Sequence, residues 1–369
     1  MIAQTARIIY RETNRFENVG HGTVGGWFFG DAGWLISDGI IGHSDLTAGS
    51  IMQDILSNRN SQFARIAKNL PGAVAYDNYR PLNIPGRYDG AVLSEVVLDL
   101  FPHVSSNQWE EWFDAGYITK EGCPVSHEYL VRGGEQLLHL FPDTVEPDVN
   151  ANIRLIWEDS SLIGLIKPAP LPSHPSGRFN RNTLTYLLEQ VYGSGVIRLV
   201  HRLDANTSGV MLLAKNADIA TELRMQFESG QVVKTYIARV IGHPSAQKFV
   251  GDSPIGRHRF QAGSRGVSEK GVAALTEFHV LKKLDDGTSL IQAEPKTGRT
   301  NQIRIHLWDA GYPILGDPTY LAGHRTDSRQ TLDTDDVAMC LHAKSLEFVH
   351  PETSEVIRFE SDMPQWDSS

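Results

Sequence analysis

The stretch LVHRLDANTSGVMLLAKN, residues 199–216, decides how the rest of the chain is interpreted. Both of its ends are apolar runs of the kind that form β-strands, and a short polar segment separates them. The Asn, Thr, Ser and Gly of that segment, residues 206–209, bond to their own backbone or tolerate left-handed conformations. We therefore expect a rigid turn that holds Arg202 and Asp204 between two strands, where an active-site carboxylate would lie.

Arg202 and Asp204 could instead be an ordinary ion pair on a surface turn. Such a pair contributes little to stability. The functional alternative is a nucleophile or base, since a neighbouring guanidinium favours the ionised form of a carboxylate. A metal site built from His201, Asp204 and His306 is a third possibility. No Glu-flanked histidine pair and no cysteine cluster accompanies these residues, so we do not expect a metal. No Gly-rich nucleotide-binding motif is visible either, and we expect no organic cofactor.

The longer segment GVIRLVHRLDANTSGVMLLAKN, residues 195–216, resembles the signature of the RluA-type family of RNA pseudouridine synthases. Further segments of the chain resemble the family at separate places, and the resemblance covers about residues 151–362. These segments are IRLIWEDSSLIGLIKPAPLPSHPSGRFNRNTL (153–184), KTYIARVIG (234–242), AEPKTGRTNQIRIHLWDAGYPILGDPTY (293–320) and MCLHAKSLEFVHPETSEVIRFESDMP (339–364).

The resemblance implies three catalytic residues. Asp204 matches the catalytic aspartate, Tyr236 matches a tyrosine that stacks on the target base, and Arg304 should pair with Asp204. Without the resemblance, Tyr236 would be read as a core aromatic residue and Arg304 as a solvated charge. Thr300 is expected to cap the helix that carries Arg304, and Asn301 stands where the family commonly has histidine. The residues near these positions that we expect to contact RNA are His201, Arg202, Lys234, Arg299, Asn301 and Gln302.

The charge of the chain is unevenly distributed. The formal net charge is −10, yet residues 151–310 carry 20 Lys and Arg against 14 Asp and Glu. Within them, the Gly-rich loop GRHRFQAGSRGVSEKG, residues 256–271, contains Arg257, Arg259 and Arg265, which suit contacts with phosphate groups. The alternative for this loop is a solvated hairpin tip without a ligand.

Three domains are expected. Residues 1–88 form an N-terminal extension of unknown role, with a helix over residues 50–69 and then a proline-marked loop over residues 71–85. Residues 89–148 form a small module, and residues 149–369 form the pseudouridine synthase catalytic domain.

The small module resembles an RNA-binding unit named after a ribosomal small-subunit protein. Its apolar spacing predicts helices over residues 92–100 and 107–115, and two strands, at 117–119 and 128–131, should flank a Gly-Cys-Pro turn before Gly133-Gly134 closes the unit. The module is an acidic variant, because Lys120 and Arg132 are its only basic residues. Strong RNA binding by an acidic surface is not expected.

The sequence thus predicts an α+β enzyme with a mixed, largely antiparallel central sheet, preceded by a small α+β RNA-binding module. The resemblance implies that it isomerises uridine to pseudouridine in structured RNA, either ribosomal RNA or tRNA. The alternative is a non-catalytic RNA-binding or RNA-chaperone protein on the same fold. The first twenty residues lack a signal-peptide core and no run of 18 apolar residues occurs, so we expect a cytoplasmic protein without a membrane partner, and a monomer.

Overall fold

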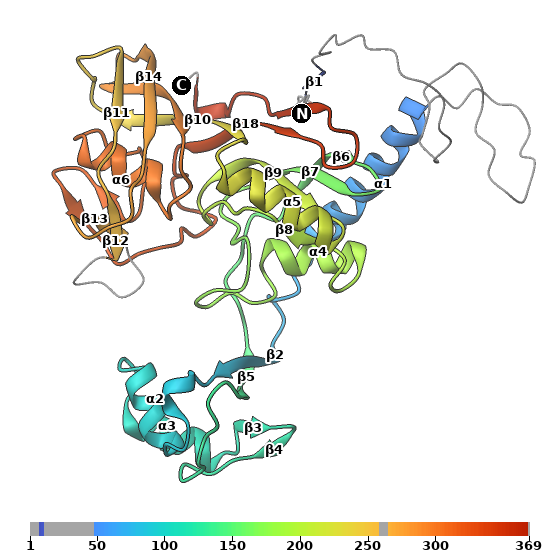
Figure 1. The fold of residues 1–369 in the computed structure, drawn as a ribbon, viewed down its shortest axis with the longest axis vertical. Coiled ribbons are helices and arrows are strands. Elements are labelled where there is room, and N and C mark those ends of the chain that lie inside the picture. The colour runs from blue at the N-terminus through green and yellow to red at the C-terminus, as the bar shows by residue number, and fades with distance from the viewer. Residues whose placement is uncertain (1–6, 11–47, 258–264, 368–369) are drawn as a thin grey trace, which may run out of the picture.

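The computed structural model describes residues 7–10, 48–257 and 265–367. A large sheet forms a main body, and a small module is joined to it by two chain segments (Figure 1). The order of hydrogen-bonded strands is β11-β14-β15-β10-β18-β9-β7-β6, with β8, β19 and β1 attached at its sides. Every pairing in this sheet is antiparallel except that of β18 with β9. The prediction of an α+β fold with a mixed, largely antiparallel sheet is confirmed.

The strands of the large sheet are β1 (Arg7–Tyr10), β6 (Arg154–Glu158), β7 (Leu162–Lys167), β8 (Arg198–Leu199), β9 (Ser208–Ala214), β10 (Val233–Ile241), β11 (Lys248–Gly251), β14 (Thr276–Lys283), β15 (Thr288–Pro295), β18 (Leu341–Val349) and β19 (Val356–Glu360). The main body also contains helices α1 (Ala48–Lys68), α4 (Leu184–Tyr192), α5 (Ala217–Glu228) and α6 (Gln302–Asp309), the hairpins β12 (Ile255–Arg257) with β13 (Arg265–Val267) and β16 (Tyr320–Leu321) with β17 (Arg325–Thr326), and the 3-10 helix η2 (Gln365–Asp367). None of the helices in the described ranges is long and apolar enough to cross a membrane.

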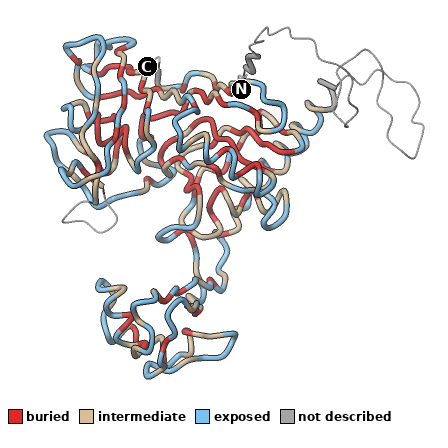
Figure 2. The backbone as a smooth tube through the Cα atoms, viewed as in Figure 1, coloured by how far each residue is buried: buried red, intermediate tan, exposed pale blue. Residues whose placement is uncertain are grey.

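Strands β7 and β9 are largely apolar because both faces of the sheet are covered where they lie. Successive side chains of β9 point to opposite faces, so Met211 and Leu213 join one core with α1 and α4, while Val210 and Leu212 join another with α5. Figure 2 shows this buried layer along the middle of the main body. Helix α5 begins after Asn216, whose side chain accepts the Ile219 N–H at 2.9 Å.

Helix α1, predicted over residues 50–69, packs on the main sheet. The Phe63 side chain is 1% exposed and lies in the core formed with α4. The Asn60 side chain also accepts the Leu155 N–H at 2.7 Å and donates to the Leu155 carbonyl at 3.2 Å, which attaches the helix to β6. Strand β1 pairs with β19 at another edge of the sheet. Part of the N-terminal region thus completes the core of the main body.

Replacing Phe63 with Ala tests this packing. We expect the variant to lower the free energy of unfolding by about 3–5 kcal/mol, because an aromatic side chain is removed from a closed core. The exposed Ser61 on the same helix is the control, and Ser61→Ala should change the free energy by no more than about 0.5 kcal/mol. Denaturant titration measures both. A Phe63→Ala variant as stable as the parent would mean that α1 is not part of the core.

The small module has its own sheet and core. It contains β2 (Tyr76–Asn83), the 3-10 helix η1 (Gly86–Tyr88), α2 (Leu93–Leu100), α3 (Ser106–Asp114), β3 (Ile118–Lys120), β4 (Cys123–Pro124) and β5 (Gln136–Thr144), with strand order β2-β5-β3-β4. Both predicted helices are confirmed.

Two predictions for this region are wrong. The segment predicted as a proline loop contains β2, which pairs with β5 while Pro81 occupies an edge strand, a place where its missing N–H is tolerated. The strand predicted at 128–131 is only a single bridge between Val92 and Leu130, and β5 follows Gly133-Gly134 instead. The predicted boundary at residue 88 therefore cuts through the module.

A buried carboxylate fixes the junction between the module and the main body. Glu146, 3% exposed, accepts the backbone N–H groups of Asn180, Arg181 and Asn182 at 2.7–2.9 Å. These residues end the loop that contains His174, whose ring lies 3.0 Å from the Arg202 guanidinium. The junction thus helps to position a loop beside the turn that carries Asp204.

Candidate active site

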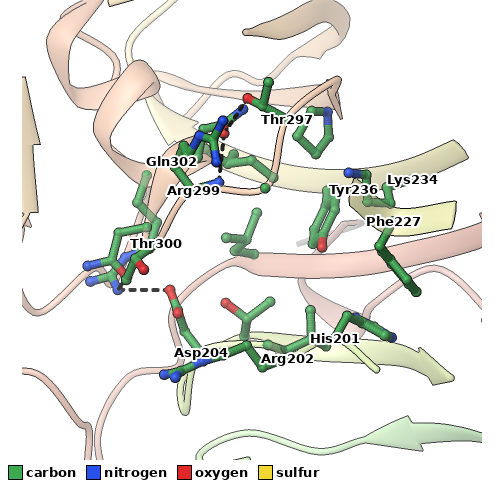
Figure 3. Close-up of a pocket in the computed structure, with 18 of the residues that line it drawn as sticks. His201, Arg202, Asp204, Phe227, Lys234, Tyr236, Thr297, Arg299, Thr300 and Gln302 are labelled. Carbon is green, nitrogen blue, oxygen red and sulfur yellow. Dashed lines mark hydrogen bonds and ion pairs between the residues drawn. The ribbon is translucent and has the colours of Figure 1, made fainter. Parts of the chain in front are cut away.

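A cavity of about 500 Å³ opens beside the 199–216 segment (Figure 3). Its walls come from the turn after β8, the end of α5, the start of β10, the loop after β15 and the start of α6. The lining residues are Val200, His201, Arg202, Leu203, Asp204, Thr207, Phe227, Glu228, Lys234, Tyr236, Pro295, Lys296, Thr297, Gly298, Arg299, Thr300, Asn301, Gln302, Ile303, Arg304 and Leu341.

The turn that carries Asp204 is held mainly by contacts with distant residues. The Lys167 ammonium is fully buried and donates to the carbonyl oxygens of Pro168, Leu171 and Ala205 at 2.9, 2.9 and 3.2 Å. The Asn206 side chain donates to the Gln330 carbonyl and accepts the Leu332 N–H at 2.9 and 3.0 Å. The predicted rigidity of the turn is consistent with this network, although the sequence indicated only local bonds.

Arg304 links Asp204 to a second carboxylate. Its Nη1 donates to Asp204 at 3.2 Å, and its Nε and Nη2 donate to the two oxygens of Asp317 at 2.7 and 2.8 Å. Burial alone would lower the Arg304 pKa, but the charges of Asp317 and Asp204 raise it above its usual value, so the guanidinium stays charged. The resemblance indicated the pair with Asp204. Asp317 lies within one of the segments that resemble the family, but its spacing from Arg304 gave no sign of the contact.

The helix that carries Arg304 differs from the prediction. Thr300 does not cap α6: the N-cap is Asn301, in a left-handed conformation at φ 58° and ψ 19°, and its side chain makes no capping bond. All residues from Gln302 to Leu307 are buried, because the sheet and neighbouring hairpins enclose this short helix. Arg304 is therefore buried in the site and not on a solvated face.

Tyr236 projects from β10 into the pocket, toward the side where His201 and Asp204 lie (Figure 3). Its ring is partly buried and packs against the cores on both sides of it. Burial, and then the charge of Asp204, raise the pKa of the Tyr236 hydroxyl above its usual value. Tyr236 therefore offers the pocket an aromatic face and a neutral phenol.

The two histidines of the alternative metal site have other partners. His201 Nε2 accepts the Leu212 N–H at 3.0 Å while its ring stacks on Phe227, and burial lowers its pKa to about 3. His306 lies within hydrogen-bond distance of both Thr276 Oγ1 and the Ser253 carbonyl, at 3.0 and 3.1 Å. Over the described ranges, no group of three or more His, Cys, Asp or Glu could hold a metal ion.

Gln302 was expected to contact RNA, but its side chain is buried and bonded within the protein. Its oxygen accepts from Thr297 Oγ1 and the Arg299 N–H at 2.7 and 3.0 Å, and its nitrogen donates to the Leu275 carbonyl and Thr276 Oγ1, both at 2.9 Å. These bonds use its donors and acceptors, so Gln302 orders the loop after β15. Like the neutral His201, it is badly suited to phosphate contact.

Of the positive side chains expected to contact RNA, Arg202, Lys234 and Arg299 line the pocket, and Arg265 does not. Arg202 and Arg299 are exposed, and Lys234 is partly buried, with a pKa lowered by burial and then by the charge of Lys296. Arg265 begins β13 and is also partly buried.

Two other expected RNA contacts lie partly or wholly outside the described residues. Arg257 ends β12, but its side chain is outside the described part of the chain, and Arg259 lies entirely outside it.

Comparison with known proteins shows the family of the chain. Residues 161–308 match the model of the family described as RNA pseudouridylate synthase. The chain is 32% identical over 283 residues to "Uncharacterized RNA pseudouridine synthase YlyB" of Bacillus subtilis (strain 168), which covers 73% of this chain and 90% of that protein. The chain belongs to the RluA-type family of RNA pseudouridine synthases.

This pseudouridine synthase has other relatives. It is 30% identical over 298 residues to "Ribosomal large subunit pseudouridine synthase D" of Pseudomonas aeruginosa, covering 78% of this chain and 92% of that protein. A solved structure titled "Human RNA Pseudouridylate Synthase Domain Containing 4" has a TM-score of 0.46 and 27% identity, covering 57% of this chain and 89% of that one. As a member of the family, the protein is an isomerase that forms pseudouridine in RNA.

Proposed function

We propose that Asp204 is the catalytic carboxylate of this pseudouridine synthase and that its substrate is a uridine in structured RNA, either ribosomal RNA or tRNA. One observation carries the proposal: Asp204 lines a pocket in which Arg304 holds it from one side, at 3.2 Å, and the Tyr236 ring lines the same space. An RNA-chaperone function on the same fold has no need for these three groups in one pocket.

The reaction breaks the bond between the ribose and N1 of uracil, turns the base within the pocket and joins the ribose to carbon 5, which loses its proton while N1 gains one. Asp204 can serve it by attacking the ribose anomeric carbon or deprotonating the sugar, or by adding to carbon 6 of the ring. Each route needs an ionised carboxylate, and the Arg304 guanidinium pairs with Asp204 at 3.2 Å. Tyr236 then stacks on the captured base.

The target uridine must leave its stack to reach Asp204, which costs a few kcal/mol. Arg202 is exposed beside the pocket and is suited to fill the vacated space or to hold a phosphate. We propose that Lys234 and Arg299 hold flanking phosphates, and that Arg257, Arg259 and Arg265 extend the contact. We further propose that Asn301 acts inside the site, as argued below.

The dependence of RNA affinity on salt tests the rim contacts. Replacing Arg299 with Ala should weaken binding and lower the slope of log affinity against log salt by about one unit, because one phosphate contact is lost. Exposed Lys282 lies on β14 and does not line the pocket, so Lys282→Ala is the matched control and should leave the slope unchanged. Filter binding at several salt concentrations gives both slopes. Equal slopes for Arg299→Ala and the parent would mean that Arg299 does not contact an RNA phosphate.

We propose that the main body supplies most of the RNA affinity and that the acidic small module contributes little. The net positive charge of residues 151–310 supports this division.

The name of the Pseudomonas relative favours large-subunit ribosomal RNA over tRNA as the substrate. We also propose that the protein acts as a monomer in the cytoplasm.

Incubation of the full chain with RNA tests the function. Prefolded large-subunit ribosomal RNA and prefolded tRNA, both lacking pseudouridine, would be incubated with the protein in separate reactions that contain EDTA. Each RNA would then be digested, and its nucleosides would be separated by chromatography. We expect pseudouridine in one RNA class, at a defined position, and no requirement for a transition metal. Pseudouridine in neither RNA class would contradict the proposed substrate. Pseudouridine only after addition of a transition metal would support the alternative metal site of His201, Asp204 and His306.

A further inference from the structure

Asn301 stands between the Arg304 guanidinium and the base of a neighbouring hairpin. Its side-chain oxygen accepts from Arg304 Nη1 at 3.1 Å, and its side-chain nitrogen donates to the Tyr320 hydroxyl at 3.2 Å. That hydroxyl in turn donates to the backbone carbonyl of Arg265 at 2.8 Å. One chain of hydrogen bonds thus runs from Asp204 to β13.

The direction of each bond in this chain is determined. A guanidinium can only donate, so the amide oxygen of Asn301 must face Arg304 and its nitrogen must face Tyr320. The Tyr320 side chain is 1% exposed, and its hydroxyl proton is directed to the carbonyl of Arg265. Asn301 therefore has one orientation that satisfies all its partners.

Nη1 is the nitrogen of Arg304 that faces Asp204, and Asn301 is the other residue to which it donates. Asp317 holds Nε and Nη2, so it anchors the far side of the guanidinium. Asn301 consequently sets where the near side lies relative to the carboxylate.

Asn301 has an unfavourable backbone conformation, and the hydrogen bonds of its side chain offset the energetic cost. Its φ of 58° lies in the left-handed region, which is unfavourable for a residue with a Cβ, although asparagine tolerates it better than most. Non-glycine residues in this region persist when surrounding contacts require them, and they gather at functional sites. Here the required contacts are those with Arg304 and Tyr320.

We propose that Asn301 is a positioning residue, which fixes Arg304 Nη1 against Asp204 and ties this ion pair to β13. This inference rests on the proposed catalytic role of Asp204. Asn301 acts on the reaction through Arg304 and contributes little to RNA affinity. Tyr320 supports it by fixing the amide from the other side.

Asn301→Gly is the test variant, because glycine keeps the left-handed backbone and removes the side chain that carries the amide. We expect the rate at saturating RNA to fall roughly 10- to 100-fold, since small displacements of a catalytic group have effects of this size. RNA affinity should stay within about three-fold and thermal stability should be retained. Tyr320→Phe should lower the same rate by a smaller factor, and the double variant should be no slower than Asn301→Gly, because the two residues act in one chain.

Ser354→Gly is the matched control, because exposed Ser354 has φ 59° in the turn between β18 and β19, outside the pocket. It should leave the rate unchanged. An Asn301→Gly variant with the parent's rate would overturn the inference, as would one that weakens RNA binding while reaching the parent's rate at saturation. Asp204→Asn is measured in parallel. If Asp204→Asn is inactive, either of these two results for Asn301→Gly would refute only the role of Asn301. If Asp204→Asn is active, the proposed function itself would be refuted.

Discussion

An Asp204→Asn variant is expected to bind RNA within a few-fold of the parent and to form pseudouridine at least about 1,000-fold more slowly. Loss of a group that acts directly on the substrate has effects of this size or larger. Folding should survive, because Lys167 and Asn206 hold the turn through contacts that do not involve the Asp204 carboxylate. A single-turnover assay with excess enzyme measures the chemistry, and filter binding measures the affinity.

Asp218→Asn is the control for the change in net charge. Asp218 is exposed in the first turn of α5, so this variant loses one negative charge as Asp204→Asn does, without altering the pocket. It should retain the parent's rate. Substantial turnover by Asp204→Asn would contradict the assignment of the carboxylate, whatever the behaviour of the control.

Replacing Arg304 with Gln should affect both stability and activity. The guanidinium is 3% exposed, and its loss leaves the fully buried side chain of Asp317 without its charged partner. Breaking a buried ion pair in this way costs about 3–5 kcal/mol of the free energy of unfolding. Denaturant titration should show a loss of this size, and pseudouridine formation should fall to background.

A second substitution separates stability from chemistry. Asp317→Asn in the Arg304→Gln background removes the uncompensated charge while still accepting the N–H groups of Thr319 and Tyr320. The double variant should recover much of the stability and remain inactive, because Asp204 still lacks its guanidinium. Recovery of activity together with stability would mean that Arg304 serves the fold alone.

Local chemistry made the turn with Asp204 predictable. Apolar runs on both sides of a polar segment indicate two strands and a turn, and the structure has β8 and β9 there. The pair between Asp204 and Arg304 lay beyond such reasoning, because 100 residues separate them and helical spacing alone favours a solvated arginine. The resemblance to the family supplied that contact.

Other features could not be predicted because they depend on contacts with residues that are distant in the sequence. The amphipathic pattern of α1 shows that one face is buried, but not that Phe63 packs against α4. Prolines led to the prediction of a loop where β2 lies, because the pairing that stabilises β2 comes from β5, more than fifty residues away. Likewise, Gln302 resembles an RNA contact in sequence, and only its distant partners in β14 and the loop before it show that it is fully bonded within the protein.

Mapping pseudouridine at nucleotide resolution in total RNA tests the central claim most directly. The comparison is between cells with the intact gene, cells without it and cells in which Asp204→Asn replaces the parent. We expect one uridine, or a small set in one class of structured RNA, to lose its modification both without the gene and with Asp204→Asn, although the variant protein is present. An unchanged map in cells without the gene, or a complete map with Asp204→Asn, would contradict the account.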